Sequence, residues 1–197
     1  MPKIAIILGS SRQSNNGAGF ASWLSPLLDT VLNESHSPVS DSRPFSIVLV
    51  DPTVAPHPLG PVIDGTRIPA EIRDPTLYAS PAVRAWSALV SSCDAFVILT
   101  PQYNWSFPGE LKNALDHLYW EWHGKPVLLV TYGGHGGSNK NIEITLPKEY
   151  ISGGHRVPAD GLNPEFLLQY EPAVRAAARE MQQMLLHEPV PVMQHHN

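Results

Sequence analysis

Residues 100–126 read "TPQYNWSFPGELKNALDHLYWEWHGKP" and stand between two apolar runs, Ala95–Leu99 and Val127–Val130. Both runs are short and apolar throughout, which is typical of strands buried in a parallel sheet. Pro108 and Gly109 open a pattern with helical spacing, which predicts a helix over Pro108–Trp122. This stretch therefore predicts a strand, a polar and aromatic loop, a helix and a second strand.

The same alternation extends over the whole chain. The expected strands are Ile4–Leu8, Phe45–Val50, Ala95–Thr100, Val127–Tyr132 and Arg156–Ala159. The expected helices are residues 17–32, 80–92, Pro108–Trp122 and 171–187. Strands that alternate with helices predict an α/β fold, in which an open parallel sheet carries helices on both faces.

The composition describes one ordinary globular domain. The chain has 197 residues, of which 43% are hydrophobic and 16% charged, and a formal net charge of −5. This charge argues against nucleic acid or an anionic membrane as a partner. We expect a single domain over residues 1–188 and a flexible tail over 189–197, where a His195–His196 pair is better explained by a frayed terminus than by a metal site.

Cysteine usage and the N-terminal sequence bear on the compartment. Cys93 is the single cysteine of the sequence, so no intrachain disulfide can form, which fits a reducing environment. The N-terminal "MPKIAIILGSSR" reads as a first strand rather than a signal peptide, and no apolar run approaches the length of a membrane span. We therefore expect a cytoplasmic protein.

Proline is abundant, with 20 residues, and many of them lie between residues 52 and 81. Each proline fixes its own backbone and removes a hydrogen-bond donor, so this segment cannot form one long regular element. We expect an excursion over the surface, of the length that is usually functional or flexible.

Ligands of parallel α/β sheets bind beyond the carboxyl ends of the strands, and three loops there have unusual compositions. The first, "GSSRQSNNG" at residues 9–17, combines hydroxyls, amides and Arg12 with the start of a helix. A helix start attracts anions, so the loop fits a phosphate site, although a polar turn that caps the helix explains it equally well. It is neither a P-loop nor a Gly-x-Gly-x-x-Gly loop.

The second loop, residues 101–107, places Tyr103, Trp105 and Phe107 among polar amides. It fits a flat ligand with hydrogen-bonding edges, and the alternative is simple packing of the aromatic groups. The third loop, "YGGHGGS" at residues 132–138, has glycines that let a backbone approach a ligand closely. His135 within it is a candidate substrate contact or general acid, or else a solvent-facing residue.

The segments "GSSR", "PQYNWSFPGELKNALDHLYWEW" and "GKPVLLVTYGGHGG" resemble the NAD(P)H-dependent FMN reductase family, with the quinone and azo-dye reductases of fungi and bacteria closest. The resemblance covers roughly residues 3–138. It implies a flavodoxin-like fold with five parallel strands in the order 2-1-3-4-5. It also implies an FMN-dependent oxidoreductase that takes hydride from NADPH or NADH and reduces quinones, azo compounds or flavin by a ping-pong mechanism through FMN N5.

The resemblance also assigns roles to residues. Those that would hold the FMN phosphate are Ser10, Arg12, Asn15, Asn16 and Gly17. Those that would line the flavin ring are Pro101, Gln102, Tyr103, Asn104, Tyr132, Gly133 and Gly134. Because the chemistry takes place on the cofactor, we expect no catalytic side chain and no metal, with Tyr103 and His135 as the candidate substrate contacts.

Members of the family are typically homodimers or tetramers, and the large side chains at Leu118, Tyr119, Trp120 and Trp122 fit such an interface. Two departures stand out. Gln102 occupies a position where the family usually has glutamate, and residues 139–160 lack the clean helix of relatives, since Pro147 breaks the pattern after at most two turns. Together with the excursion at 52–77, this predicts an altered rim of the pocket. A pathway-specific enzyme of secondary metabolism, and a redox-sensing flavoprotein that controls a protein partner, therefore remain open alternatives.

Overall fold

Five parallel strands form one sheet at the centre of the computed structural model, which describes residues 1–34, 45–62, 67–134, 142–152 and 154–186. The strands are β1 (Lys3–Leu8), β2 (Ser46–Val50), β3 (Ala95–Pro101), β4 (Val127–Gly133) and β5 (Ile142–Thr145). Their order across the sheet is β2-β1-β3-β4-β5, and every neighbouring pair is parallel. The expected order 2-1-3-4-5 is therefore confirmed.

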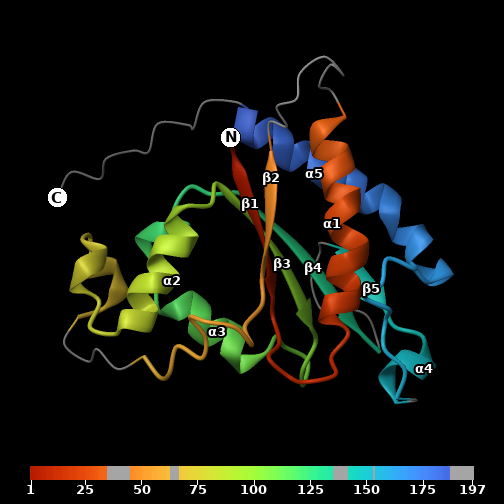
Figure 1. The fold of residues 1–197 in the computed structure, drawn as a ribbon, viewed down its shortest axis with the longest axis horizontal. Coiled ribbons are helices and arrows are strands. Elements are labelled where there is room, and N and C mark those ends of the chain that lie inside the picture. Colours follow the sequence, from red (N-terminus) through yellow and green to blue (C-terminus); the bar gives the residue numbers. More distant parts are fainter. Residues whose placement is uncertain (35–44, 63–66, 135–141, 153, 187–197) are drawn as a thin grey trace.

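Helices cover both faces of the sheet, so the central strands are apolar throughout (Figure 1). The helices are α1 (Gly17–Asn33), α2 (Pro81–Ser91), α3 (Gly109–Asp116), α4 (Lys148–Ile151) and α5 (Glu171–Leu186). Helices α1 and α5 lie on one side, where Ile4, Ile6 and Leu8 of β1 point. Helices α2 and α3 lie on the other side, where Ala5 and Ile7 point.

The N-terminal and C-terminal helices pack against each other. Helix α1 buries a broad apolar face although Pro26 stands inside it, because the neighbouring core supplies the stability that a proline removes. Gln182 of α5 donates a 2.8 Å hydrogen bond to the Leu32 carbonyl oxygen, and Arg175 lies 3.5 Å from the Glu34 carboxylate. These contacts fix α5 beside α1, as the ribbon in Figure 1 shows.

The helix expected over Pro108–Trp122 is wrong at its end. Helix α3 stops at Asp116, and a short 3-10 turn follows at Trp120–Trp122. The cause is Glu121, which is buried and accepts hydrogen bonds from the Ser87 hydroxyl (2.5 Å) and the Tyr78 hydroxyl (3.3 Å). A buried carboxylate needs such donors. Because the helix ends at Asp116, the Glu121 carboxylate can reach Ser87 of α2.

This change of path also alters the interpretation of the large side chains there. Leu118 is buried, and Trp122 packs edge-on against Trp86 and Phe96 with ring centroids 5.8 and 4.9 Å apart. Both therefore belong to the core of this chain rather than to an outer face. Of the four residues, Tyr119 is 50% exposed and so remains on the surface. The homodimer or tetramer stays a prediction.

The fifth strand lies at Ile142–Thr145, not at Arg156–Ala159 as expected. It pairs with β4 from Val130 to Gly133, with Ile142 and Ile144 buried and the two residues between and after them exposed. Residues 142–145 thus form a strand before Pro147, where at most two turns of helix had been expected. Residues 156–159 form no strand, because Val157 donates its backbone N–H to the Asn16 side chain rather than to a neighbouring strand.

The proline-rich segment after β2 contains no long element in its described residues, as expected. It holds two 3-10 turns, η1 (Pro69–Glu71) and η2 (Pro75–Leu77). Another turn, η4 (Glu165–Tyr170), precedes α5. No described helix is both long and apolar enough to cross a membrane. The predicted tail at 189–197, with its His195–His196 pair, lies outside the described residues.

Candidate functional site

The loop after β1 is pressed against the end of β3. Gly9 donates its backbone N–H to the Leu99 carbonyl oxygen at 2.8 Å. A Cβ atom at Gly9 would lie 2.3 Å from the Thr100 hydroxyl oxygen and 3.0 Å from the Thr100 Cα. Only glycine permits this approach, and it directs residues 10–16 along the carboxyl edge of the sheet.

Ser10 and Arg12 connect this loop to the loop after β3. The Ser10 hydroxyl lies 2.7 Å from the Tyr103 hydroxyl, and it accepts a 3.2 Å hydrogen bond from the Arg12 backbone N–H. The Arg12 guanidinium carbon stands 3.8 Å from the centre of the Tyr103 ring, a cation–π contact. The sequence-predicted phosphate loop and ring loop therefore meet through these three residues.

Asn15 closes the loop at the start of α1. Its side-chain oxygen accepts a 2.5 Å hydrogen bond from the Gly17 backbone N–H, and its side-chain nitrogen donates to the Arg12 carbonyl oxygen. The backbone N–H of Gly17, the first residue of α1, is thus already hydrogen-bonded to a side chain. A phosphate at this point would have to displace the Asn15 oxygen, while Arg12 would remain available to it.

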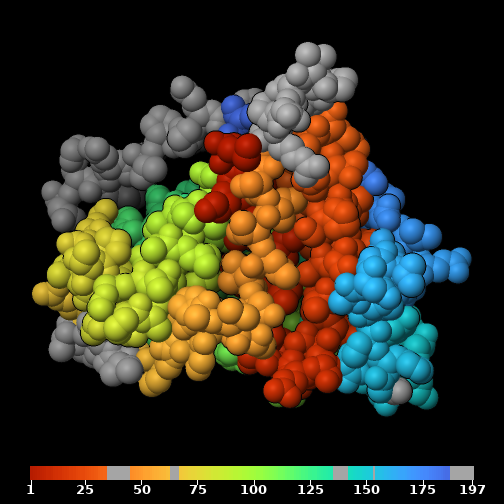
Figure 2. Space-filling model, viewed as in Figure 1, coloured from red at the N-terminus to blue at the C-terminus, as the bar shows by residue number. Residues whose placement is uncertain are grey.

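Asn16 holds a segment from the far end of the chain. Its side-chain nitrogen donates to the Tyr150 carbonyl oxygen at 3.1 Å, and its oxygen accepts from the Val157 backbone N–H at 2.9 Å. Both ends of the Asn16 side-chain amide therefore hold this segment in position. Figure 2 shows the result as the red atoms of the first loop beside the cyan atoms of the segment around α4.

Arg156 reaches the first loop from this segment. Its guanidinium Nε donates to the Ser14 carbonyl oxygen, and its Nη1 donates to the His155 carbonyl oxygen at 2.6 Å. Ser14 meets it with a backbone φ of 57°, in the left-handed region that few residues other than glycine adopt. Arg156 thus brings a second cation to the phosphate loop, although it had been expected in a strand.

A tight turn shapes the loop after β3. Tyr103 and Ser106 exchange backbone hydrogen bonds of 2.8 and 2.9 Å, and the residues between them, Asn104 and Trp105, have φ values of 49° and 63°. Positive φ at both central positions is the geometry of a type I′ turn, which is unusual for a tryptophan. The turn holds Trp105 outward, so that 75% of the residue is exposed. Phe107 is 41% exposed, so the alternative of simple packing does not hold for either of these two aromatic residues.

The end of β4 forms the opposite wall. Tyr132 stacks against Phe20 of α1 with ring centroids 4.4 Å apart and accepts a 2.8 Å hydrogen bond at its carbonyl oxygen from the Gln102 N–H. Burial, with a smaller effect of Tyr103, raises the pKa of the Tyr132 phenol well above its usual value. The neutral hydroxyl therefore remains a hydrogen-bond donor. At Gly134 a Cβ atom would lie 2.8 Å from Ile151 Cδ1.

These walls enclose a cavity of about 360 Å³ at the carboxyl edge of the sheet, within the usual range of small-molecule sites, roughly 300–1,000 Å³. The predicted residues that line it are Arg12, Asn15, Asn16, Pro101, Gln102, Tyr103, Tyr132, Gly133 and Gly134. The lining residues that sequence reasoning missed are Gln13, Ser14, Leu146, Tyr150, Ile151 and Arg156. Ser10, Gly17 and Asn104 are not among the described lining residues, and His135 lies outside the described residues.

The electrostatics of the cavity favour an anion. Among its described lining residues the charged side chains are Arg12 and Arg156, both cations. The remaining lining is neutral and includes two tyrosines beside Tyr103. A ligand with an anionic end and a flat neutral body fits this arrangement, and FMN has both features. Within the described residues, no group of three histidine, cysteine or acidic side chains could hold a metal ion.

Comparison with known proteins agrees with this geometry. The model of the NADPH-dependent FMN reductase family matches residues 2–146. The NAD(P)H-dependent FMN reductase LOT6 of Saccharomyces cerevisiae is 40% identical over 142 residues, which cover 72% of this chain and 71% of the yeast protein. The NAD(P)H-dependent FMN reductase C4B3.06c of Schizosaccharomyces pombe is 38% identical over 138 residues, 70% of this chain and 61% of that protein.

A solved structure supports the fold. The flavoenzyme FerB of Paracoccus denitrificans, described as an NAD(P)H:(acceptor) oxidoreductase, aligns with a TM-score of 0.53 and 19% identity over 92% of this chain and 99% of FerB. At this identity the likeness concerns the fold. The family model covers most of the chain, and the yeast relative shares the same region at 40% identity. The chain therefore belongs to the NADPH-dependent FMN reductase family.

Proposed function

We propose that this chain is an FMN-dependent oxidoreductase that uses NADPH or NADH to reduce quinones, azo compounds or flavin. The observation that carries the proposal is the cavity at the carboxyl edge of the sheet, whose described lining combines two arginines, Arg12 and Arg156, with tyrosine and glycine residues. Arginine side chains suit the terminal phosphate of FMN. The two yeast relatives, both named as NAD(P)H-dependent FMN reductases, support the same cofactor.

The side chains divide the work of binding between them. Arg12 and Arg156 bind the phosphate, and Asn16 positions the segment that carries Arg156. Ser10 holds the Tyr103 hydroxyl at 2.7 Å and so fixes the wall beside the ring. When bound, FMN supplies the two-electron chemistry that links the nicotinamide to an acceptor. The protein needs no nucleophile of its own for that reaction.

The direct test is anaerobic reduction of the purified FMN-loaded protein by NADPH and by NADH. We expect the flavin absorption band to bleach, and we expect added benzoquinone to restore it, with parallel lines in the double-reciprocal plots of steady-state rates. A protein that binds FMN but is not reduced by either nucleotide would contradict the proposal and favour a redox-sensing role.

A pathway-specific enzyme is the second candidate. It is favoured by the rim of the cavity, where Tyr150, Ile151 and Arg156 come from a segment beyond the match to the family model. A panel of quinones and azo dyes separates the two candidates. Broad turnover supports the general reductase, whereas reduction by NADPH without turnover of any panel member supports the narrower enzyme.

A pair of substitutions tests the assignment of the two ring loops. Gly134→Val should abolish or strongly weaken FMN binding, because Gly134 lines the cavity and the added side chain would occupy space that we assign to the edge of the flavin ring. Trp105→Ala should keep FMN and change the ratio of rates among quinones, because Trp105 stands at the exposed tip of the turn. Bound flavin, measured from the absorption spectrum, and rates with several quinones check both. The opposite pattern, with full flavin in Gly134→Val and none in Trp105→Ala, would show that the assignment is wrong.

A further inference from the structure

Asn16 and Gly17 are the single Asn-Gly pair of the sequence, and they stand where the first loop enters α1. An asparagine followed by glycine is chemically unstable, because glycine has no side chain to keep its backbone nitrogen from the side-chain carbonyl carbon of the asparagine. Attack by that nitrogen closes a succinimide ring and releases ammonia. We therefore expect Asn16 to be the asparagine that reacts first when the chain is unfolded.

The fold holds both reacting groups of this pair. The Asn16 side-chain nitrogen donates to the Tyr150 carbonyl oxygen at 3.1 Å, and its oxygen accepts from the Val157 backbone N–H at 2.9 Å. The Gly17 backbone N–H, which must lose its proton before the nitrogen attacks, donates to the Asn15 side-chain oxygen at 2.5 Å. Ring closure pulls the amide carbon onto the following backbone nitrogen, so these hydrogen bonds must break first. The folded chain therefore protects the pair.

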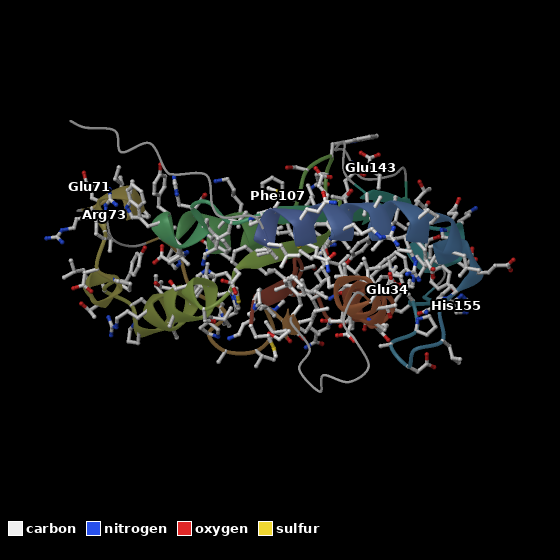
Figure 3. All side chains as sticks on the ribbon, turned by 90° about the horizontal axis from the view of Figure 1, so that it is seen from above. Glu34, Glu71, Arg73, Phe107, Glu143 and His155 are labelled. Carbon is white, nitrogen blue, oxygen red and sulfur yellow. The ribbon has the colours of Figure 1, made fainter. Side chains whose placement is uncertain are left out.

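The protection depends on a segment at the surface, residues 154–157. Residues 154–156 are exposed, and Figure 3 shows His155 at the outer margin of the molecule. Val157 is the buried end of the segment, and Arg156 adds its hydrogen bond to the first loop. Exposed segments with few buried side chains open locally while the core stays folded. Opening of segment 154–157 would free the Asn16 amide.

We propose that Asn16–Gly17 is a deamidation site whose reactivity is controlled by opening of segment 154–157. In the open state the Gly17 nitrogen forms a bond to the Asn16 side-chain carbon, the bond from that carbon to its amide nitrogen breaks, and ammonia leaves with the proton of the N–H. Water then hydrolyses one of the two carbon–nitrogen bonds of the succinimide. The product at position 16 is aspartate or isoaspartate, and the reaction needs no oxidant or reductant.

Deamidation changes the loop permanently. A carboxylate has no proton to donate to the Tyr150 carbonyl oxygen, so this bond cannot form again. Isoaspartate also adds a methylene group to the backbone at the start of α1. Asn16 lines the cavity together with Arg12 and Arg156, so the new negative charge opposes the binding of a phosphate. This consequence rests on the proposed function, and it predicts that deamidated molecules bind FMN more weakly.

Peptide mass spectrometry of the flavin-free full chain, incubated at mildly alkaline pH with and without urea, tests the proposal. We expect Asn16 to be the first asparagine to deamidate in urea, and its native rate to be at least about tenfold lower, because hydrogen bonds must open first. The native rate should still exceed the urea rate multiplied by the equilibrium constant of global unfolding, because the opening is local. A native rate equal to the urea rate, or one no faster than global unfolding allows, would overturn the proposal.

Arg156→Ala tests the role of the segment. Loss of its hydrogen bond to the Ser14 carbonyl oxygen should raise the native rate about three- to tenfold and leave the rate in urea unchanged. Arg73→Ala is the matched control and should change neither rate, since Arg73 lies at the opposite margin of the molecule in Figure 3. Circular dichroism checks that both variants are folded. Equal native rates in wild type and Arg156→Ala would show that the segment does not control the reaction.

Titration with FMN distinguishes the two proposals. Asn16→Asp, which carries the product carboxylate, should bind FMN about fivefold more weakly than Asn16→Ala, which loses the same donor without gaining a charge. Equal affinities would overturn the predicted effect of deamidation on the cavity. A wild-type protein that binds no FMN would contradict the proposed function, whereas the rates of the flavin-free protein would still report on the deamidation site.

Discussion

Replacing Arg12 with alanine should weaken FMN binding about ten- to a hundredfold and leave riboflavin binding nearly unchanged. The two ligands differ only in the phosphate, and Arg12 is one of the two arginines among the described lining residues, with its guanidinium carbon 3.8 Å from the centre of the Tyr103 ring. A hydrogen bond to a charged group contributes roughly 1.5–3 kcal/mol, which corresponds to this range of affinity. Fluorescence titration of the flavin-free protein with each ligand measures the difference.

Arg73→Ala is the matched control for this experiment. Arg73 also stacks on an aromatic ring, with its guanidinium carbon 3.4 Å from the centre of the Trp120 ring, but it does not line the FMN cavity. It should leave both affinities unchanged. Equal losses of FMN and riboflavin in Arg12→Ala would mean that Arg12 supports the loop rather than the phosphate.

Replacing Gly19 with valine should destabilise the protein by on the order of 3 kcal/mol and also weaken FMN binding. A Cβ atom at Gly19 would lie 2.0 Å from the Val157 carbonyl oxygen and 2.5 Å from its carbon. These are backbone atoms held by the Val157 hydrogen bond to Asn16, so they cannot move aside cheaply. In Gly19→Val the segment around Val157 must therefore move away from α1, and the hydrogen bond from Arg156 to the Ser14 carbonyl oxygen is lost with it.

Urea unfolding of Gly19→Val and of Gly109→Ala measures the effect against a glycine in open space. Gly109 begins α3, and a Cβ atom there has no neighbour within 4 Å. Gly109→Ala should therefore change the free energy of unfolding by less than about 0.5 kcal/mol. A Gly19→Val protein as stable as wild type would show that the segment around Val157 is not seated on α1 in solution.

The sheet was predictable because its signals are local. Each of the first four strands is a short apolar run that ends in a polar or glycine-rich loop, and β1 to β4 lie where those runs predicted them. Strand β5 was missed although Ile142–Thr145 carries the alternation of a half-buried strand. A strand of four residues is a weak signal, and the family resemblance implied a helix, not a strand, in this part of the chain.

The sequence predicted the part of the candidate site that is formed by the loops directly after the strands. It did not predict the part formed by the distant segment that contains Tyr150 and Arg156. The three loops supply eleven of its lining residues, nine of them predicted, and Figure 1 shows that β1, β3 and β4, which these loops follow, end at the same edge of the sheet. Tyr150 and Arg156 reach the same cavity through Asn16, whose bonds span 134 and 141 residues of sequence. No local pattern encodes such a contact. The end of α3 was likewise decided by the buried Glu121 and its partners on another helix.

The preference between FMN and FAD tests the central claim most directly. The first loop and Arg156, which donates to the Ser14 carbonyl oxygen, border the part of the cavity where we propose that the phosphate binds, so we expect a terminal phosphate to fit better than an added adenylate. Titration of the flavin-free protein with FMN, FAD and riboflavin under the same conditions gives three dissociation constants. We predict one FMN per chain, bound at least about tenfold more tightly than FAD or riboflavin. Tight binding of FAD with no binding of FMN would contradict the account.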